Sequence, residues 1–449
     1  MTNATINILN SGLLGNVGKY LLILLPIFLP IFLLYAFLSI RFRWITMTFN
    51  NKQPPCLLEI RLPKEITKSP AAMEVFFYYF AQRGADNYGE AYLDGKTRPW
   101  FSCEIVSTGG AVRFFVWCSE TKFRNLIEAQ LYAQYPNLEI FEADDYTKDF
   151  YFDPENYPMF GAQYTLVKAD PFPIKTYIDY GLDEDQKEEY KIDPITSVLE
   201  YMGSLKRGEN AWTQILVRKH EKETWEHGVL KLKVDPKKAN FIELFLISIF
   251  GRSKDLKEEV QTEIEKIKKS TLPKAEKGDD KIMKFPNPTK GQQEVIAALE
   301  RSATKTPFDC MIRSIYIAEK SSFVATSIGG LVGGLKQYGS LNLNSFKPDV
   351  TPDAKFEWQN DLGRIFPFVK SSIDKRGNNI KKDLLYAYKL RSYFQHPYKN
   401  YGKSHPFVLT TEELATIFHF PSGMVSQTPT LQRVGSKKSE APANLPIQK

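Results

Sequence analysis

The sequence has few of the residues that bind metals or act as nucleophiles. It contains four cysteines and five histidines in 449 residues. The cysteines form no CxxC pair, and the histidines form no HExxH motif and no pair four residues apart, so the common zinc-site spacings are excluded. No serine or cysteine lies in a nucleophile-elbow context. We therefore expect no catalytic residues, no metal site and no cofactor.

Other polar residues that could suggest chemistry have simpler interpretations. His220 and His227 lie seven residues apart in a charged segment and are expected to be solvated. Asp144 and Asp145 are adjacent on an extended segment, so their side chains point to opposite faces and cannot act as a catalytic pair. We expect a solvated strand end there.

The scarce cysteines indicate a compartment. Cys56, Cys103, Cys118 and Cys310 are scattered, and three of them lie in apolar, strand-like runs. This pattern favours buried free thiols over disulfides or metal ligands. Free thiols are typical of a reducing compartment.

A phosphate-binding loop is also lacking. The glycine-rich stretch "SIGGLVGGLKQYG" places Lys336 two residues after Gly334 and follows it with Gln337. A Walker loop needs the order GxxxxGK[ST], so the register fails. The glycines are better explained as a helix surface that lets the helix approach its sheet closely.

The positive charge is concentrated in two segments. The net charge is +7, of which residues 252–290 contribute 11 − 8 = +3 and residues 421–449 contribute 4 − 1 = +3. The rest of the chain is nearly neutral. A nucleic-acid-binding face usually shows a strong basic excess on the folded part, which disfavours that function class here.

One long apolar run is present near the N-terminus. Residues 20–40, from Tyr20 to Ile40, include no charged side chain and would extend about 30 Å as a helix, the thickness of a bilayer core. Pro26 and Pro30 are tolerable in lipid. A buried soluble helix and a signal peptide are the alternatives, but the run is longer than a usual signal core and no cleavage site follows it.

The flanking charges predict the orientation of this segment. Arg41, Arg43 and Trp44 follow the run directly, whereas only Lys19 precedes it. By the positive-inside rule, residues 1–19 lie outside the cytoplasm and the long C-terminal part lies inside it. We expect a single-pass protein of the inner (cytoplasmic) membrane.

The fold class predicted for the rest is α+β, with two ferredoxin-like units. In residues 54–150, strand-like runs and helical stripes follow in the order β-α-β-β-α-β, which is that of the split βαβ fold. Residues 158–350 repeat this order more weakly, with a long helical insertion at about 220–304. Within the insertion, Asn240–Phe250 is too short to span a bilayer and could lie in a core or on the membrane surface.

The C-terminal part is predicted to end in a definite structure. Residues 354–421 are expected to be helical, and Thr410 and Glu413 form a capping box in "FVLTTEELATIFHFP". Residues 422–449 are polar, basic and proline-containing, so we expect a disordered tail.

One strand carries an aromatic face. Arg113, Phe115 and Trp117 alternate on the third predicted strand, and RNA-binding ferredoxin-like domains stack bases on such a surface. However, the RNP1 pattern requires glycine where this strand has Arg113 or Phe114. The face either packs against the second unit or a partner surface, which we favour, or contacts nucleic acid.

The stretch "WFSCEIVSTGGAVRFFVWCSETKFRNLIEAQLYAQYPNLEIFEADDYT" carries a resemblance, as do "HPFVLTTEELATIFHFP" and "TPTLQRVGSKKSEAPANLPI". The chain resembles the uncharacterised N-terminal region of membrane-anchored type IV secretion or conjugation ATPases (TraG-like or HerA-like) of candidate-phyla bacteria. The likeness extends from Tyr20 to Ile447. In that family a motor domain follows; here no such motor is found, so no ATPase residues carry over.

Two function hypotheses follow. The first is a non-catalytic, membrane-anchored scaffold of a type IV secretion-like machine, whose partner is a separately encoded HerA-like or TraG-like motor ATPase. Its basic tail, with Arg433, Lys437 and Lys438, would dock the partner. The second is a membrane-tethered module that binds single-stranded nucleic acid. Self-association is open under both hypotheses.

Overall fold

The computed structural model describes eleven stretches of the chain: residues 15–63, 66, 68–85, 89–184, 192–221, 225–226, 229–230, 256–271, 287–351, 367–403 and 406–421. The predicted segment Asn240–Phe250 and the tail from residue 422 lie outside them. The chain forms two compact units. The first comprises residues 1–52, 85–97 and 222–253, and the second comprises residues 53–84, 98–221 and 254–449.

The first unit is built on one long helix. Helix α2 (Gly15–Lys52) continues through Pro26 and Pro30, so it extends beyond both ends of the predicted span at 20–40. Within the described residues, its stretch Phe32–Lys52 is long and apolar enough to cross a membrane, and 11% of its 18 most apolar consecutive residues are buried. That result rests on length and composition, criteria that a signal sequence also meets. A single π-helical turn, η2 (Glu90–Asp94), packs against α2.

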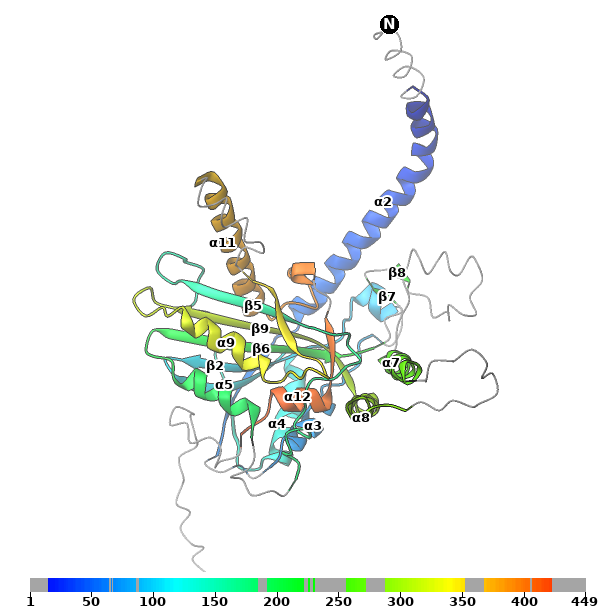
Figure 1. The fold of residues 1–449 in the computed structure, drawn as a ribbon. Helices are drawn as coiled ribbons and strands as arrows, with labels where there is room; N and C mark the ends of the chain where they lie inside the picture. Colours follow the sequence, from blue (N-terminus) through cyan, green and yellow to red (C-terminus); the bar gives the residue numbers. More distant parts are fainter. Residues whose placement is uncertain are drawn as a thin grey trace, which may run out of the picture. The chain divides into compact units, whose positions relative to one another are not determined.

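The second unit mixes helices with one antiparallel sheet. Nine strands are hydrogen-bonded, in the order β10-β5-β9-β6-β2-β3-β1-β4, with β11 also paired to β9 (Figure 1). The strands are β1 (Cys56–Arg61), β2 (Phe101–Thr108), β3 (Ala111–Cys118), β4 (Glu139–Glu142), β5 (Met159–Leu166), β6 (Glu209–Lys219), β9 (Pro307–Ala318), β10 (Phe346–Val350) and β11 (Phe407–Thr410). Two short strands of the first unit, β7 (Trp225–Glu226) and β8 (Val229–Leu230), pair with each other.

Helices of the second unit connect these strands. They are α3 (Ala71–Tyr78), α4 (Arg124–Gln134), α5 (Pro194–Gly203), α7 (Leu256–Ser270), α8 (Lys290–Thr304), α9 (Thr326–Lys336), α11 (Pro367–Lys389) and α12 (Thr411–Ile417), with 3-10 turns η3 (Thr121–Phe123) and η5 (Tyr401–Lys403). Helix α3 turns one side into the core, where Met73, Phe76 and Phe77 are fully buried. Helix α5 is capped by Asp193, whose side chain accepts a hydrogen bond from the Ile195 N–H.

The element order repeats in the two halves of the sheet. The first half runs β1-α3-β2-β3-α4-β4 and the second runs β5-α5-β6-β9-α9-β10. In each half the first strand lies between the third and the fourth, and the second strand pairs with the third. The halves join through their second strands, β2 and β6, which are antiparallel over eight residue pairs from Phe101↔Val217 to Thr108↔Asn210.

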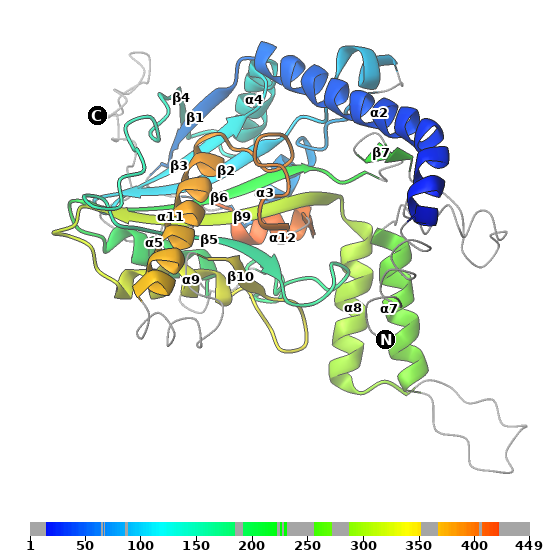
Figure 2. The ribbon, with the colours of Figure 1, turned by 90° about the horizontal axis from the view of Figure 1, so that it is seen from above.

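A helical hairpin interrupts the second half between β6 and β9. Helices α7 and α8 lie side by side (Figure 2) and bury Val260 and Leu299 against each other and against Val408 of β11. Helix α8 begins with a capping box, in which Thr289 and Gln292 exchange both hydrogen bonds. The hairpin is therefore packed against β11, and its second helix is stabilised at its N-terminal cap.

The two faces of the sheet are covered differently. Helices α3, α4, α5, α9 and α12 cover one, called here the helical face, and its core includes Phe77, Phe114 and Ile312. Helix α11 and the irregular segments 143–152 and 390–403 cover the other, called here the α11 face (Figure 2). Alternation along the strands sends successive side chains to opposite faces, so Phe114 joins one core and Phe115 the other.

The glycines of α9 allow a close helix contact. A Cβ atom at Gly330 would lie 2.4 Å from the Tyr201 ring, and one at Gly334 would lie 3.2 Å from Val198. Both neighbours belong to α5, so the predicted close approach is to a neighbouring helix rather than to the sheet. Tyr201 also donates a hydrogen bond to the Ser327 carbonyl, 2.6 Å away.

Strand β11 pairs with the part of β9 that β5 does not reach. Strand β5 pairs with the Ile312–Ile317 part of β9, whereas β11 pairs with Pro307–Cys310. Strand β6 occupies the other edge of β9 along its length, so β11 continues the row of β5. Residues 354–421, which we predicted as helical, thus contain a strand as well as α11 and α12. Backbone groups of β9 that would otherwise be unpaired explain why a strand forms here.

Candidate functional site

The segment that precedes the predicted docking tail is the natural place to look for a functional site. We call Phe407–Pro421 the C-terminal clasp; it comprises β11, α12 and the four residues after them, and all of its residues are buried. The predicted capping box is confirmed. Glu413 accepts from the Thr410 N–H at 2.8 Å, and the Thr410 hydroxyl accepts from the Glu413 N–H at 3.5 Å.

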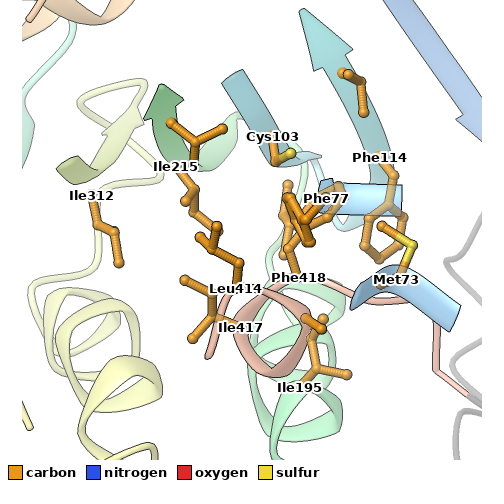
Figure 3. Close-up of a cluster of buried hydrophobic side chains, with 14 of the residues drawn as sticks. Met73, Phe77, Cys103, Phe114, Ile195, Ile215, Ile312, Leu414, Ile417 and Phe418 are labelled. Atoms are coloured by element: carbon orange, nitrogen blue, oxygen red, sulfur yellow. The ribbon is translucent and has the colours of Figure 1, made fainter. Parts of the chain in front are cut away.

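The apolar side of the clasp enters the centre of the helical face. Leu414, Ile417 and Phe418 point toward sheet and helix side chains that include Ile215, Phe114 and Phe77 (Figure 3). The Phe418 ring packs edge-on against Phe77 and Phe114, with centroids 6.4 and 5.8 Å apart. Burial of large apolar side chains is the main stabilising contribution of such a segment. The clasp is therefore a core element of the second unit.

The polar side of the clasp carries two buried carboxyl groups. Glu413 is 3% exposed and also accepts from the Ile174 N–H at 2.9 Å. Burial raises the pKa of Glu413 to about 7, against the opposing effect of these backbone donors. Close to neutral pH, a substantial share of Glu413 side chains is therefore protonated.

Glu412 belongs to a wider charge network. It accepts from the Thr176 hydroxyl at 2.6 Å and pairs with Arg301 at 3.0 Å and Lys305 at 3.9 Å. Burial raises its pKa, although Thr176 and both cations oppose that effect. Lys305 also pairs with Glu74 of α3 at 2.6 Å. The network thus ties α12 to α8 and to α3.

The end of the clasp is fixed to the second half of the sheet. His419 is 1% exposed, and its Nε2 lies 3.1 Å from an oxygen of Asp193, the residue that caps α5. Its Nδ1 lies 3.0 Å from the Ala415 carbonyl. Residues 407–421 are consequently held by contacts to α3, α5, α8 and β9, and the chain leaves the body at Pro421 from a fixed position.

A second polar network lies on the α11 face. Arg391 is 1% exposed, and its guanidinium pairs with Glu104 at 3.0 Å and with Asp145. Although burial opposes its charge, Glu104, Tyr146 and Asp145 raise the pKa of Arg391 well above its ordinary value. Burial also opposes the charge of Asp145, but Arg391 lowers its pKa below the ordinary range.

Further contacts complete this network. Tyr146 donates to Glu104 at 2.7 Å and its hydroxyl lies 2.8 Å from that of Tyr388 on α11. The Trp100 indole donates to the Arg391 carbonyl at 2.9 Å. Arg391 has a φ of 47°, a left-handed conformation that is uncommon outside glycine, and these contacts hold it there.

Arg313 is a second buried arginine nearby that makes hydrogen bonds to α11 and the segment after it. It is 1% exposed and donates to the carbonyls of Ala387 at 3.1 Å and Ser392 at 2.8 Å. Burial lowers the pKa of Arg313 to about 10. Two buried arginines thus fasten the end of α11 and the segment after it onto the sheet.

The predicted aromatic surface lies beneath this covering segment. Phe115 is 1% and Trp117 8% exposed, and the Phe115 ring packs on Tyr146 with centroids 5.1 Å apart. The guanidinium of Arg113 lies 5.4 Å from the centre of the Phe115 ring. A base could stack on Phe115 or Trp117 only after residues 143–152 and 390–403 had moved away. The cover of this face thus comes from segments outside residues 158–350, and not from the predicted second unit.

Two minor predictions were wrong. His220 is not merely solvated: its Nδ1 lies 2.6 Å from Asp309. Burial would raise the pKa of Asp309, but Arg218, His220 and Arg98 together lower it to about 2. Asp145 is half-buried against Arg391, whereas Asp144 is exposed as predicted. Sequence could not reveal these partners, since each is more than 85 residues away in the chain.

The cysteines are buried and free, as predicted. Cys56 and Cys118 are direct partners across β1 and β3, and the hydrogen bond between their thiols lowers the pKa of Cys56 and raises that of Cys118. Burial raises the pKa of Cys103 and Cys310. Among the described residues, no group of three histidine, cysteine, aspartate or glutamate side chains could hold a metal ion.

Several predicted anchor residues lie on exposed parts of α2. Pro26, Pro30, Arg41 and Arg43 are exposed, and Ile40 and Trp44 are each 67% exposed. The side chain of Tyr20 and the predicted tail residues Arg433, Lys437 and Lys438 fall outside what the structure describes. The apolar length of α2 thus has no protein covering over most of its described part.

Comparison with known proteins adds one result. A family model described as a domain of unknown function, DUF8128, matches residues 57–433. The chain belongs to the DUF8128 family. The matched DUF8128 region begins at β1, after the apolar helix, and includes both halves of the sheet and the whole clasp. A search of curated proteins found no significant match to this DUF8128 member.

Proposed function

We propose that the protein is a non-catalytic, membrane-anchored scaffold that presents a docking tail to a separate partner. The observation that carries this proposal is the clasp: fifteen consecutive buried residues fix the position from which residue 422 onward leaves the body. A partner bound to the tail would be held at a defined place on the second unit. The ion pairs of Glu412 with Arg301 and Lys305 support this proposal, because they tie the clasp to α8 and the residue after it.

The anchor is helix α2, which we propose crosses the inner membrane once, with the C-terminal part in the cytoplasm. Arg41 and Arg43 on the C-terminal side of the apolar run support this orientation. The free cysteines support it as well, because Cys56 and Cys118 face each other and an oxidising compartment would favour a disulfide between them.

We further propose that the two halves of the sheet are ferredoxin-like units. The repeated element order and the identical strand arrangement in each half support this interpretation. The α7–α8 hairpin would then be an insertion in the second unit. Two such units joined edge to edge offer a rigid base for the clasp.

The partner that we propose is a motor ATPase of the HerA-like or TraG-like type, within a machine related to type IV secretion or conjugation. The resemblance of the chain to the N-terminal regions of such ATPases supports this choice. The basic residues Arg433, Lys437 and Lys438 would supply the charge for docking.

Co-purification of the full chain from its native membranes tests this proposal. We expect a motor ATPase in the eluate, and its loss when residues 428–449 are deleted. A variant whose tail has the same composition in scrambled order is the matched control for charge alone. An eluate without an ATPase, or one unchanged by the deletion, would contradict the docking role.

Thiol counting tests the orientation. Protein taken directly from membranes, unfolded in the presence of a maleimide, should react at all four cysteines if the second unit is cytoplasmic. Reaction at only two, restored to four by a reductant, would show a Cys56–Cys118 disulfide and contradict a cytoplasmic location.

A further inference from the structure

A short segment of the first unit, the turn η2 and the residues after it, packs against α2 just after the apolar run. The turn after η2 is pressed against α2: Gly95 has a φ of 71°, and a Cβ atom there would lie 2.4 Å from the Ile45 side chain. Ile45 and Thr46 are 7% and 6% exposed. The Thr97 hydroxyl donates to Asn50 of α2 at 2.9 Å. Residues 89–97 are therefore fixed against residues 45–50 of the helix.

This contact lies at a definite depth relative to the apolar run. Five residues separate Ile40 from Ile45, or about 8 Å along a helix axis. The headgroup layer on each side of a bilayer core is about 5–8 Å thick. If Ile40 marks the end of the hydrocarbon, the turn η2 packs against α2 at the level of the lipid headgroups.

Side chains at this level combine apolar and basic character. Leu93 of η2 and Trp44 of α2 are 68% and 67% exposed, and Met47 is 42% exposed. Residues 41–52 of α2 contain Arg41, Arg43 and Lys52 and no acidic residue. On the η2 side, Glu90 is paired with Lys96 at 2.7 Å, and Asp94 is exposed. Residues 41–52 and 89–97 together carry four basic and two acidic side chains, a net charge of 4 − 2 = +2. Exposed leucine and tryptophan beside an excess of basic charge is the composition of a surface that binds anionic lipid.

We propose that residues 41–52 and 89–97 form a juxtamembrane foot that binds the anionic bilayer surface, with Leu93 inserted among the lipids. The proposal rests on α2 being a membrane anchor. The occupant is inferred to be lipid because the exposed Trp44 and Met47 of α2 continue the exposed apolar side chains of the span, and because the foot has a net charge of +2. The foot would restrict tilting of α2, since two points of the first unit would touch the membrane.

Site-directed labelling in lipid nanodiscs tests the foot with the full chain. Leu93→Cys carries a spin label, and Leu341→Cys, at a leucine that is 98% exposed in the second unit, is the matched control. Wild-type protein, which carries only the four buried cysteines, measures the background labelling. We expect the label at position 93 to be relaxed by oxygen and shielded from an aqueous nickel chelate, and the label at 341 to show the reverse.

Lipid charge provides the second measurement. With Arg41→Gln and Arg43→Gln together, shielding at position 93 should weaken in discs with phosphatidylglycerol toward that in phosphatidylcholine alone. Equal nickel accessibility at positions 93 and 341 would overturn the foot, as would shielding from both reagents, which indicates a protein neighbour. Extraction of the chain by alkaline carbonate would instead refute the anchor itself, so the two failures are distinguishable.

Discussion

The two faces of the sheet reach the same degree of burial by different means. On the helical face, regular helices place apolar stripes over apolar strand positions, as Phe77 and Ile127 show. On the α11 face, the strands present Glu104, Gln214 and Arg313, all at most 1% exposed. There, irregular segments satisfy the charges through specific hydrogen bonds. The stability of the helical face depends on the amount of apolar surface that is buried. The stability of the α11 face depends also on the identity of a few polar partners.

This difference decides how each face should respond to substitution. An apolar core loses free energy in proportion to the surface and cavity involved, and its neighbours can partly relax. A buried ion network loses much more when one partner is removed, because the other charge stays buried and unpaired. Arg391→Met and Leu414→Ala compare the two faces, and two further tests compare buried polar groups of the clasp with conservative or exposed counterparts; they follow from the largest expected effect to the smallest.

Arg391→Met should give the largest loss, on the order of 3–5 kcal/mol in the free energy of unfolding. It leaves Glu104, which is 0% exposed, without its cation. Urea unfolding of the full chain in detergent micelles, followed by tryptophan fluorescence, measures the effect. Arg113→Met is the control on the neighbouring strand and should cost less than about 1 kcal/mol. Recovery of part of the loss on adding Glu104→Gln would support the network; a loss no larger than that of the control would refute it.

Leu414→Ala should destabilise the helical face by about 2–5 kcal/mol, because a fully buried leucine leaves a cavity under the clasp. Leu341→Ala, at a position 98% exposed, serves as the matched control and should change the free energy of unfolding by less than about 0.5 kcal/mol. The same urea experiment measures both. If Leu414→Ala behaves like Leu341→Ala, then the clasp is not part of the core.

Glu413 should make the clasp sensitive to pH. The folded pKa of about 7 is above the ordinary value, so the folded state binds the proton more tightly than the unfolded state. The contribution to stability is greatest below about pH 4.5 and is lost as the pH rises toward 7. Relative to Glu413→Gln, the wild type should lose on the order of 2–3 kcal/mol between pH 5 and pH 8. A difference between the two proteins that is constant over this range would contradict the raised pKa.

The two capping boxes give the finest comparison. Thr410→Ala removes the box of buried α12 and should cost about 1–2 kcal/mol, whereas Thr289→Ala removes the exposed box of α8 and should cost about 0.5–1 kcal/mol. The difference arises because donors at a buried helix start cannot bind water instead. Thermal unfolding of the two variants measures it, and equal shifts would mean that water reaches the start of α12.

Much of the helical face could be predicted from sequence. The stripe of α3, the caps of α5 and α12, and the element order of both halves depend on local periodicity and local hydrogen bonds, which neighbouring residues specify. The strand β11 was missed because "FVLT" is short and its partner in β9 is about a hundred residues away, at Pro307–Cys310. A short strand that forms only because a distant strand has unpaired backbone groups has little sequence pattern of its own.

The α11 face could hardly be predicted. Its aromatic side chains Phe115 and Trp117 were found by alternation, but their covering was not, because it consists of irregular segments held by Arg391 and Arg313. From sequence alone, an arginine in a turn is expected to be solvated. Arg391 is instead buried, because the distant carboxylates Glu104 and Asp145 pair with it. In the clasp, the capping box predicted the hydrogen bond between Glu413 and Thr410, but not the contacts of Glu413 with Ile174 or of Glu412 with Thr176, which are distant in the chain.

The pairing of β11 with β9 also has a consequence for the order of events during synthesis. The strand pairs of the first half join residues at most 142 − 58 = 84 positions apart, at Leu58↔Glu142, but the clasp joins residues such as Ile174 and Glu413, 239 positions apart. Translation proceeds from the N-terminus, so the helical face emerges with a vacant row beside the start of β9 and an uncovered patch around Phe114. Long-range closure of this kind is slow. A nascent chain is therefore open to chaperones, or to an early partner, until the clasp has been made.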